Sequence, residues 1–119
     1  MKKVAIPEKM QKFYGIGTML HPDKEMVEAM IREIPIGKVA TIDSLCGRLA
    51  DDYGTDVTCP MRTTNLVKAV MGTSANSNTS IPFWRIIRKN HLLINSPFTV
   101  WCAENLEREG FQLDKSSYP

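Results

Sequence analysis

The sequence lacks the features that mark exported, membrane-spanning and disulfide-stabilised chains. No apolar stretch approaches the ~20 residues that a membrane-spanning helix requires. The basic start is followed by Glu8 and Lys9 before any apolar segment of signal-peptide length. The three cysteines are an odd set without a C-x-x-C pair, which indicates neither a disulfide framework nor a zinc site. We therefore expect a cytoplasmic protein with reduced thiols that holds no metal and no cofactor.

Acidic residues are absent from the middle of the chain. All 13 lie at or before Asp56 or at or after Glu104, so the net charge of +2 hides a purely cationic interval over 57–103. The basic residues of this interval are Arg62, Lys68, Arg85, Arg88 and Lys89. Such an asymmetry within one domain is typical of a surface that contacts phosphates, although it also arises by chance in a short chain.

The length of 119 residues favours one compact domain, because a second would leave neither half enough interior to bury. Residues 1–21 show no clean periodicity and contain a proline and two glycines. We expect them to form an N-terminal arm with a short helix over 8–14. The folded domain is expected over 22–119.

The first half of this domain has the pattern of three helices. Residues 22–34 carry one apolar stripe at helical spacing and acidic residues in the first turn. After a short extended piece at 38–40, Thr41 or Asp43 can cap a helix that Gly54 ends. A polar loop then leads to a third helix over 62–71. The residues of this helix expected to face solvent and contact DNA are Arg62, Thr63, Asn65 and Lys68. Two helices joined by a turn are typical of helix-turn-helix readers.

The second half changes character after a polar loop at 73–80. Residues 81–87 and 92–94 are predicted to be two strands around a basic turn, 88–91, with Arg88 and Lys89 available to DNA. Ser96 can cap a last helix that buries Trp101, Cys102 and Leu106 and ends at Gly110. The predicted fold is mainly α, a winged helix-turn-helix-like domain with a short β-hairpin wing.

Four segments carry motifs in a fixed order: IPIGKVAT at 34–41, KAVMG at 68–72, IPFWRII at 81–87 and LEREG at 106–110. They resemble motifs of the alkylguanine-DNA alkyltransferase family. These are, in turn, the I-P-x-G-x-V-x-T/S opening of its DNA-binding domain, the R-A-V-G-x run of its recognition helix, its I-P-C-H-R-V-V active-site segment and the L-x-x-E-G close of its last helix. The resemblance covers about residues 23–114, and together the four motifs are more specific than any one of them.

The family's enzymes flip an alkylated guanine into a pocket, where a thiolate activated by histidine accepts the alkyl group. Here Phe83 stands at the cysteine position and Trp84 at the histidine position, so transfer at this position is excluded. The chain therefore resembles the alkyltransferase-like branch, which binds alkylated DNA and flags it for nucleotide excision repair. This resemblance implies a non-enzymatic, monomeric protein whose partners are alkylated duplex DNA and excision-repair proteins.

The resemblance also assigns positions to a lesion pocket and to its DNA contacts. The pocket residues are Phe83, Trp84, Arg85, Asn76 and Ile42, the last replacing a family tyrosine. If the loop before Pro82 is two residues shorter than in the family, Lys68 replaces the arginine that the family inserts into the base stack. Lysine fills the vacated base site less well, because it lacks the planar guanidinium. The turn over 55–60 is several residues longer than the family usually carries.

Several alternatives remain open at the level of sequence. Phe83 and Trp84 can stack on a flipped base, or they can fill a collapsed pocket as core residues. Glu109 matches the glutamate that orients the histidine, but without that histidine it is expected to pair with a nearby cation. The whole chain can also be a general DNA-binding or regulatory module without lesion preference, or an enzyme that uses a displaced thiol such as Cys59.

Overall fold

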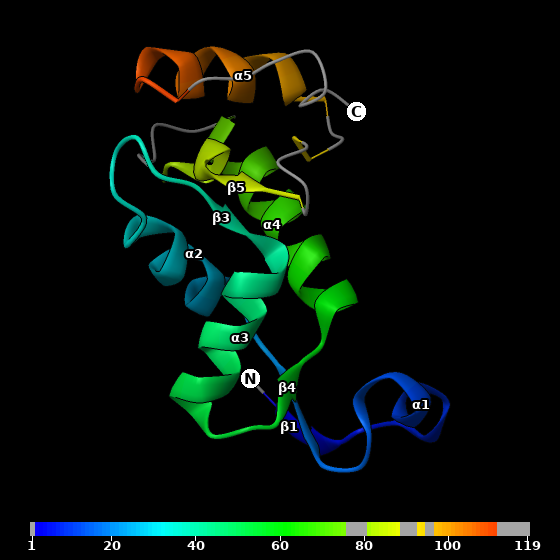
Figure 1. The fold of residues 1–119 in the computed structure, drawn as a ribbon. Helices are drawn as coiled ribbons and strands as arrows, with labels where there is room; N and C mark the ends of the chain where they lie inside the picture. The colour runs from blue at the N-terminus through cyan, green and yellow to red at the C-terminus, as the bar shows by residue number, and fades with distance from the viewer. Residues whose placement is uncertain (1, 76–80, 89–92, 95–96, 112–119) are drawn as a thin grey trace.

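The computed structural model describes residues 2–75, 81–88, 93–94 and 97–111 (Figure 1). In these residues the α-helices are α1 (Gln11–Tyr14), α2 (Lys24–Arg32), α3 (Ile42–Tyr53), α4 (Pro60–Ala75) and α5 (Thr99–Arg108). The strands are β1 (Lys2–Ala5), β2 (Thr18–His21), β3 (Ala40–Thr41), β4 (Val57–Thr58) and β5 (Ile86–Ile87). Two 3-10 turns, η1 (Glu8–Met10) and η2 (Phe83–Arg85), complete the order. The predicted predominance of helix is confirmed.

The ends of α2 and α3 follow from local capping. The Asp23 carboxylate accepts a hydrogen bond from the Met26 N–H at 3.1 Å, so Asp23 is the N-cap of α2 and not part of its first turn. Thr41 caps α3 through a reciprocal capping box with Ser44. Gly54 ends α3 at φ +71°, a left-handed conformation that favours glycine. The predicted capping by Thr41 and the stop at Gly54 are confirmed.

The N-terminal residues form more than an arm. β1 pairs antiparallel with β2, and β2 pairs in parallel with β4 at Met19↔Val57 and Leu20↔Thr58. The short helix predicted over 8–14 is present as η1 and α1, but the strands on either side were missed. The reason is that Met19 and Leu20 are consecutive and both fully buried, so β2 shows no alternation of apolar and polar residues.

The region predicted as a wing is organised differently. Residues 83–85 form a 3-10 turn and not a strand, and β5 pairs in parallel with β3 at Ala40↔Ile86 and Thr41↔Ile87. Of the expected hairpin, the described residues show one antiparallel bridge, Ile87↔Leu93. Of its basic turn, Arg88 is described and exposed, whereas Lys89 lies outside the described residues. A two-stranded wing is therefore not established.

Helices α2, α3, α4 and α5 pack around one apolar core, with α5 across one end of the molecule; α1, which has no buried residue, lies at the other end (Figure 1). The largest fully buried side chains include Ile31 from α2, Leu49 from α3, Met71 from α4, Phe83 from η2 and Leu106 from α5. No helix among the residues described here has the length and apolar character needed to cross a bilayer.

Three further expectations need correction. The helix predicted over 62–71 is longer at both ends and takes in residues 73–75, which were predicted as loop. The polar loop over 55–60 contains β4, because β2 offers it a pairing edge that the local sequence does not reveal. Trp101, predicted to face inward, is 39% exposed, whereas Cys102 and Leu106 on the same helix are buried as expected.

Candidate nucleic-acid interface

Helix α4 presents a cationic face that is held in place by its buried side. Val67, Val70 and Met71 are fully buried and fix the orientation of the helix on α2 and α3. The exposed residues Arg62, Asn65 and Lys68 follow at a spacing of three, which places them on one side of the helix. Neither Arg62 nor Lys68 forms an ion pair with any residue that the structure describes. As far as the described part of the chain shows, both charges are therefore open to an external anion.

Thr63 does not belong to this face. It was predicted to contact DNA, but it is 0% exposed, and its hydroxyl donates to the Cys59 carbonyl at 2.8 Å. A threonine hydroxyl can donate a hydrogen bond to the carbonyl four residues earlier, so the residue can occupy a buried position of a helix. The inward position follows from the helix period, since Thr63 lies four residues before Val67.

The first turns of α4 border an open groove. The groove has a volume of about 450 Å³ and is lined by Cys59, Met61, Arg62, Asn65 and Leu66. Its lining combines a guanidinium, an amide and apolar surface, so a strand of nucleic acid could place both sugar and phosphate here. The sequence pattern located Arg62 and Asn65, but not the apolar wall beside them.

The residues assigned to the lesion pocket by resemblance are partly brought together, but as a packed cluster. The Phe83 ring is 1% exposed and lies edge-on to Trp84 and Trp101, with ring centroids 5.5 and 5.7 Å apart. Ile42 is half-buried and packs against the same core, whereas Asn76 lies outside the described residues. Among the residues that the structure describes, Phe83 is thus a packed core side chain, in contact with other aromatic rings.

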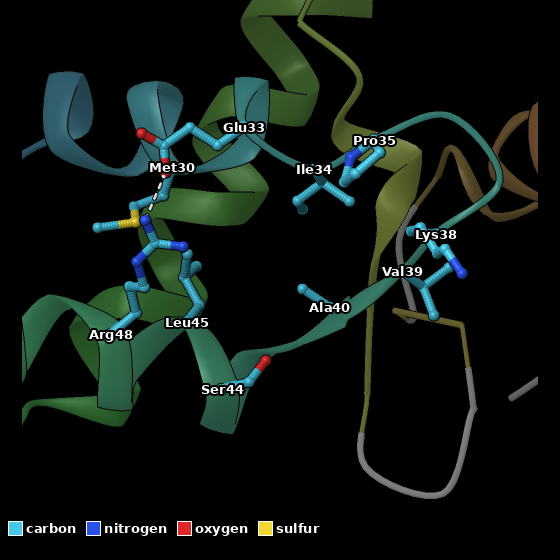
Figure 2. Close-up of a pocket in the computed structure, with 10 residues that line it drawn as sticks. All are labelled: Met30, Glu33, Ile34, Pro35, Lys38, Val39, Ala40, Ser44, Leu45 and Arg48. Carbon is cyan, nitrogen blue, oxygen red and sulfur yellow. Dashed lines mark ion pairs between the residues drawn. The ribbon is translucent and has the colours of Figure 1, made fainter.

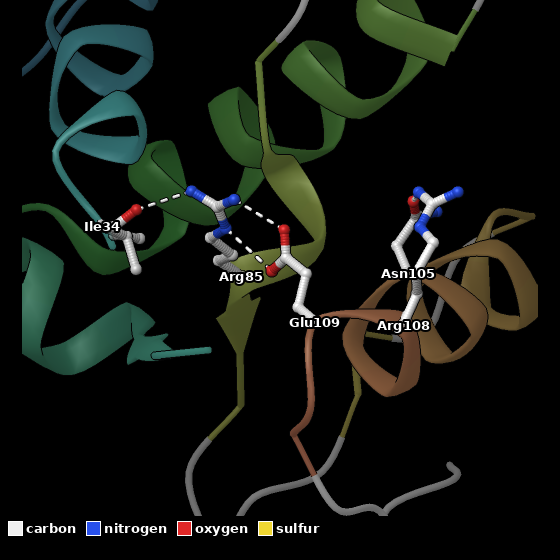
Figure 3. A network of polar contacts seen from close by, with 5 residues as sticks. All are labelled: Ile34, Arg85, Asn105, Arg108 and Glu109. Atoms are coloured by element: carbon white, nitrogen blue, oxygen red, sulfur yellow. Dashed lines mark hydrogen bonds and ion pairs between the residues drawn. The ribbon is translucent and has the colours of Figure 1, made fainter. Parts of the chain in front are cut away.

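Arg85 joins three of the four motif segments (Figure 3). Its Nε and Nη2 donate to the two carboxylate oxygens of Glu109 at 3.0 and 2.6 Å, and its Nη1 donates to the Ile34 carbonyl at 2.7 Å. Arg85 is only 9% exposed. The pairing of Glu109 with a cation, expected from the missing histidine, is confirmed. Arg85 is thus occupied within the fold and not free to contact DNA.

The Glu109 carboxylate is held in its charged form. Its hydrogen bonds with Arg85 lower its pKa, which burial alone would raise. The Trp84 indole N–H faces the same carboxylate and lowers the pKa further, although it falls short of hydrogen-bond geometry. The pair therefore acts as a charged clamp between η2 and the end of α5.

Burial disfavours two of the three thiols as nucleophiles. Burial raises the pKa of Cys102 to about 11, and it also raises the pKa of Cys46 above its ordinary value. Cys59 is half-buried in the groove beside α4. Two of the three thiols are therefore poor nucleophiles at neutral pH.

A second cavity, of about 270 Å³, lies between the end of α2, residues 34–40 and the start of α3 (Figure 2). Its floor is apolar, and its rim carries Lys38 and the ion pair between Glu33 and Arg48, whose Oε2 and Nη2 atoms are 3.1 Å apart. The cavity was not predicted from the sequence, because it forms only where the end of α2, residues 34–40 and the start of α3 fold back on one another.

Comparison of the chain with protein-family models, with curated proteins and with solved structures finds no match. The resemblance of the four motifs therefore rests on the residues themselves. The structure adds that the four segments are neighbours in space. Arg85 connects 81–87 with 34–41 and 106–110, and α4, which carries 68–72, packs against η2.

Proposed function

We propose that this chain is a non-catalytic duplex-DNA-binding protein, with α3 and α4 as a helix-turn-helix pair and α4 as the recognition helix. The observation that carries the proposal is the exposed face of Arg62, Asn65 and Lys68, whose two cations have no ion-pair partner among the described residues. Unpaired cations on a rigid helix neutralise phosphates and release counterions, which drives binding to DNA. The amide of Asn65 can read adenine in the major groove.

The proposal includes no alkyl transfer. The position that would supply the nucleophile is Phe83, and the position of its activating base is Trp84. Burial raises the pKa of Cys102 to about 11, which disfavours its thiolate as a substitute, and labelled alkyl-DNA tests Cys59, the thiol that lines the groove. Binding, and not chemistry, is the activity expected from this arrangement.

Recognition of alkylated guanine is the second candidate. It is favoured by the order of the four motifs along the chain and by their contacts, since Arg85 joins three of the segments and α4, which carries the fourth, packs against η2. It is opposed by the packing of Phe83, because a flipped base must displace a buried ring at a cost of about 1.5–3 kcal/mol. Base flipping itself costs a few kcal/mol, and one aromatic contact returns about 1–3 kcal/mol. Any lesion preference would therefore be modest.

The test of the first proposal is fluorescence anisotropy with a labelled duplex over a series of salt concentrations. Wild type should bind with an affinity that falls with salt, and Arg62→Ala and Lys68→Ala should each reduce the slope of log K against log salt by about one. Arg32→Ala, an exposed change of the same type on α2, and Lys38→Ala are the matched controls. Salt-independent binding, or equal losses in controls and test variants, would remove α4 as the recognition helix.

The test of the second candidate uses the same duplex with one guanine replaced by O6-methylguanine. Tighter binding to the alkylated duplex would support lesion recognition. Equal affinity for the two duplexes would eliminate it while leaving the first proposal intact. Phe83→Tyr, which retains the ring, separates a stacking role from a change in folding, provided that circular dichroism gives the same spectrum as wild type.

A further inference from the structure

We propose that the β1–β2 hairpin is part of the same DNA-binding surface, with Lys2 and His21 extending the cationic face of α4 onto the phosphate backbone. This inference rests on the proposed function and concerns residues outside the four motifs. The proposed surface has two elements: α4, which enters the major groove of the DNA, and the β1–β2 hairpin, which contacts the phosphate backbone beside it.

The end of β2 lies next to the start of α4. The Cys59 N–H donates to the Leu20 carbonyl at 2.9 Å, and α4 begins one residue later, at Pro60. His21 directly follows Leu20, and Arg62 lies in the first turn of α4. The main chain therefore fixes His21 and Arg62 in neighbouring positions without requiring any side-chain contact.

The register of the hairpin brings a second cation to this place. Lys2 is opposite His21 in the antiparallel pair of β1 and β2. Residues directly opposite each other in such a pair project from the same face of the sheet. Lys2 is exposed and His21 is partly exposed, so both can be reached from outside. The series of polar and cationic side chains then runs Lys68, Asn65, Arg62, His21, Lys2.

The electrostatics agree with this geometry. The pKa of His21 is lowered first by burial, then by the charge of Arg62 and then by that of Lys2. Both cations therefore act at the imidazole, from α4 and from β1. The nearest carboxylate in the sequence, Asp23, accepts a hydrogen bond from the Met26 N–H as the N-cap of α2. A phosphate placed among Lys2, His21 and Arg62 would relieve the repulsion among them.

The surface extends along the first turns of α4 and onto the hairpin. From Arg62 to Lys68 the helix advances about 9 Å, at ~1.5 Å per residue, and the hairpin continues the cationic series beyond the helix N-terminus. Phosphate contacts from elements that flank a recognition helix fix its register on the duplex. The groove of about 450 Å³ beside Arg62 lies within this surface.

The experiment measures duplex affinity at 50 and 200 mM salt for Lys2→Ala and for Lys9→Ala, an exposed lysine of η1 outside the series. Each lost phosphate contact should shrink the salt-induced rise in Kd about 3.5-fold, since a fourfold change in salt is raised to the power ~0.9. Lys2→Ala should show this change, and Lys9→Ala should not. The effect of Lys2→Ala should add to that of Arg62→Ala.

Proton linkage provides a second readout that a structural role would not affect. Phosphate next to His21 favours the imidazolium, so wild-type affinity should rise as the pH falls toward the lowered pKa that His21 has in the free protein. His21→Gln should lose this extra rise. If Arg62→Ala and Lys68→Ala weaken binding while Lys2→Ala matches Lys9→Ala and His21→Gln keeps the pH response, the hairpin is not part of the surface. If none of the variants changes binding, the α4 proposal fails as well.

Discussion

Replacing Glu109 with glutamine removes the anionic partner of a buried guanidinium. Arg85 is 9% exposed and has three hydrogen bonds to Glu109 and Ile34, two of which end on the carboxylate. Removing one partner of a buried pair leaves an uncompensated charge at a cost of about 3–5 kcal/mol. Because glutamine keeps the shape and one acceptor, we expect a loss near 3 kcal/mol. For a chain of this size that corresponds to a fall in Tm of roughly 10–20 °C.

The assay is urea unfolding followed by circular dichroism, with Glu33→Gln as the matched control. Glu33 pairs with Arg48 at 3.1 Å, but their side chains are 58% and 61% exposed, so the same substitution there should cost about 0–1 kcal/mol. The double variant Arg85→Met/Glu109→Leu should be more stable than Glu109→Gln, because it leaves no buried charge unpaired. Equal losses for Glu109→Gln and Glu33→Gln would refute the assignment of Arg85 and Glu109 as a buried clamp.

Three further predictions concern stability and reactivity. The pKa of Glu109 is lowered from its ordinary value of 4.5, so its contribution to stability is present above that pH and is lost as the pH falls through the folded-state value; Glu109→Gln should flatten acid unfolding in this range. Phe83→Ala should cost about 3–5 kcal/mol in urea unfolding, whereas Phe13→Ala, at a residue that is 72% exposed, should stay within about 0.5 kcal/mol, and similar values would contradict the packing of Phe83. Cys102, with a pKa of about 11 and 3% exposure, should react with Ellman's reagent at pH 8 only as fast as the chain unfolds, and rapid labelling in the native state would count against its burial.

Local signals were the part of the fold that the sequence could predict. Thr41 and Gly54 delimit α3 through contacts within one turn, so their meaning does not depend on the rest of the chain. The partner of Glu109 was anticipated as a cation for a similar reason: a carboxylate without its histidine still requires a counter-charge. Its identity as Arg85, 24 residues away in sequence, required the tertiary structure.

The errors fall where tertiary contacts decide. Thr63 is polar and was placed outward, but its hydroxyl is satisfied by Cys59, and the residue is buried. Strand β2 was missed because its pairing with β4 joins segments 38 residues apart, as in Met19↔Val57, and β1 was missed with it because β1 pairs with β2. From the sequence, Phe83 could either stack on a flipped base or fill the core. Its contacts with Trp84 and Trp101 favour the core role, and they could not be read from the sequence.

Strand β4 links two parts of the chain that look unrelated in the sequence, the N-terminal residues and the connection between α3 and α4. Its parallel pairing with β2 makes each the binding partner of the other. A chain that begins at Pro22 would lack β2, so β4 would have no strand to pair with. A shorter connection between α3 and α4 would remove β4, so β2 would lose the same pairing. The β1–β2 hairpin and the connection between α3 and α4 therefore stabilise each other, and removing either one leaves the other without its strand partner.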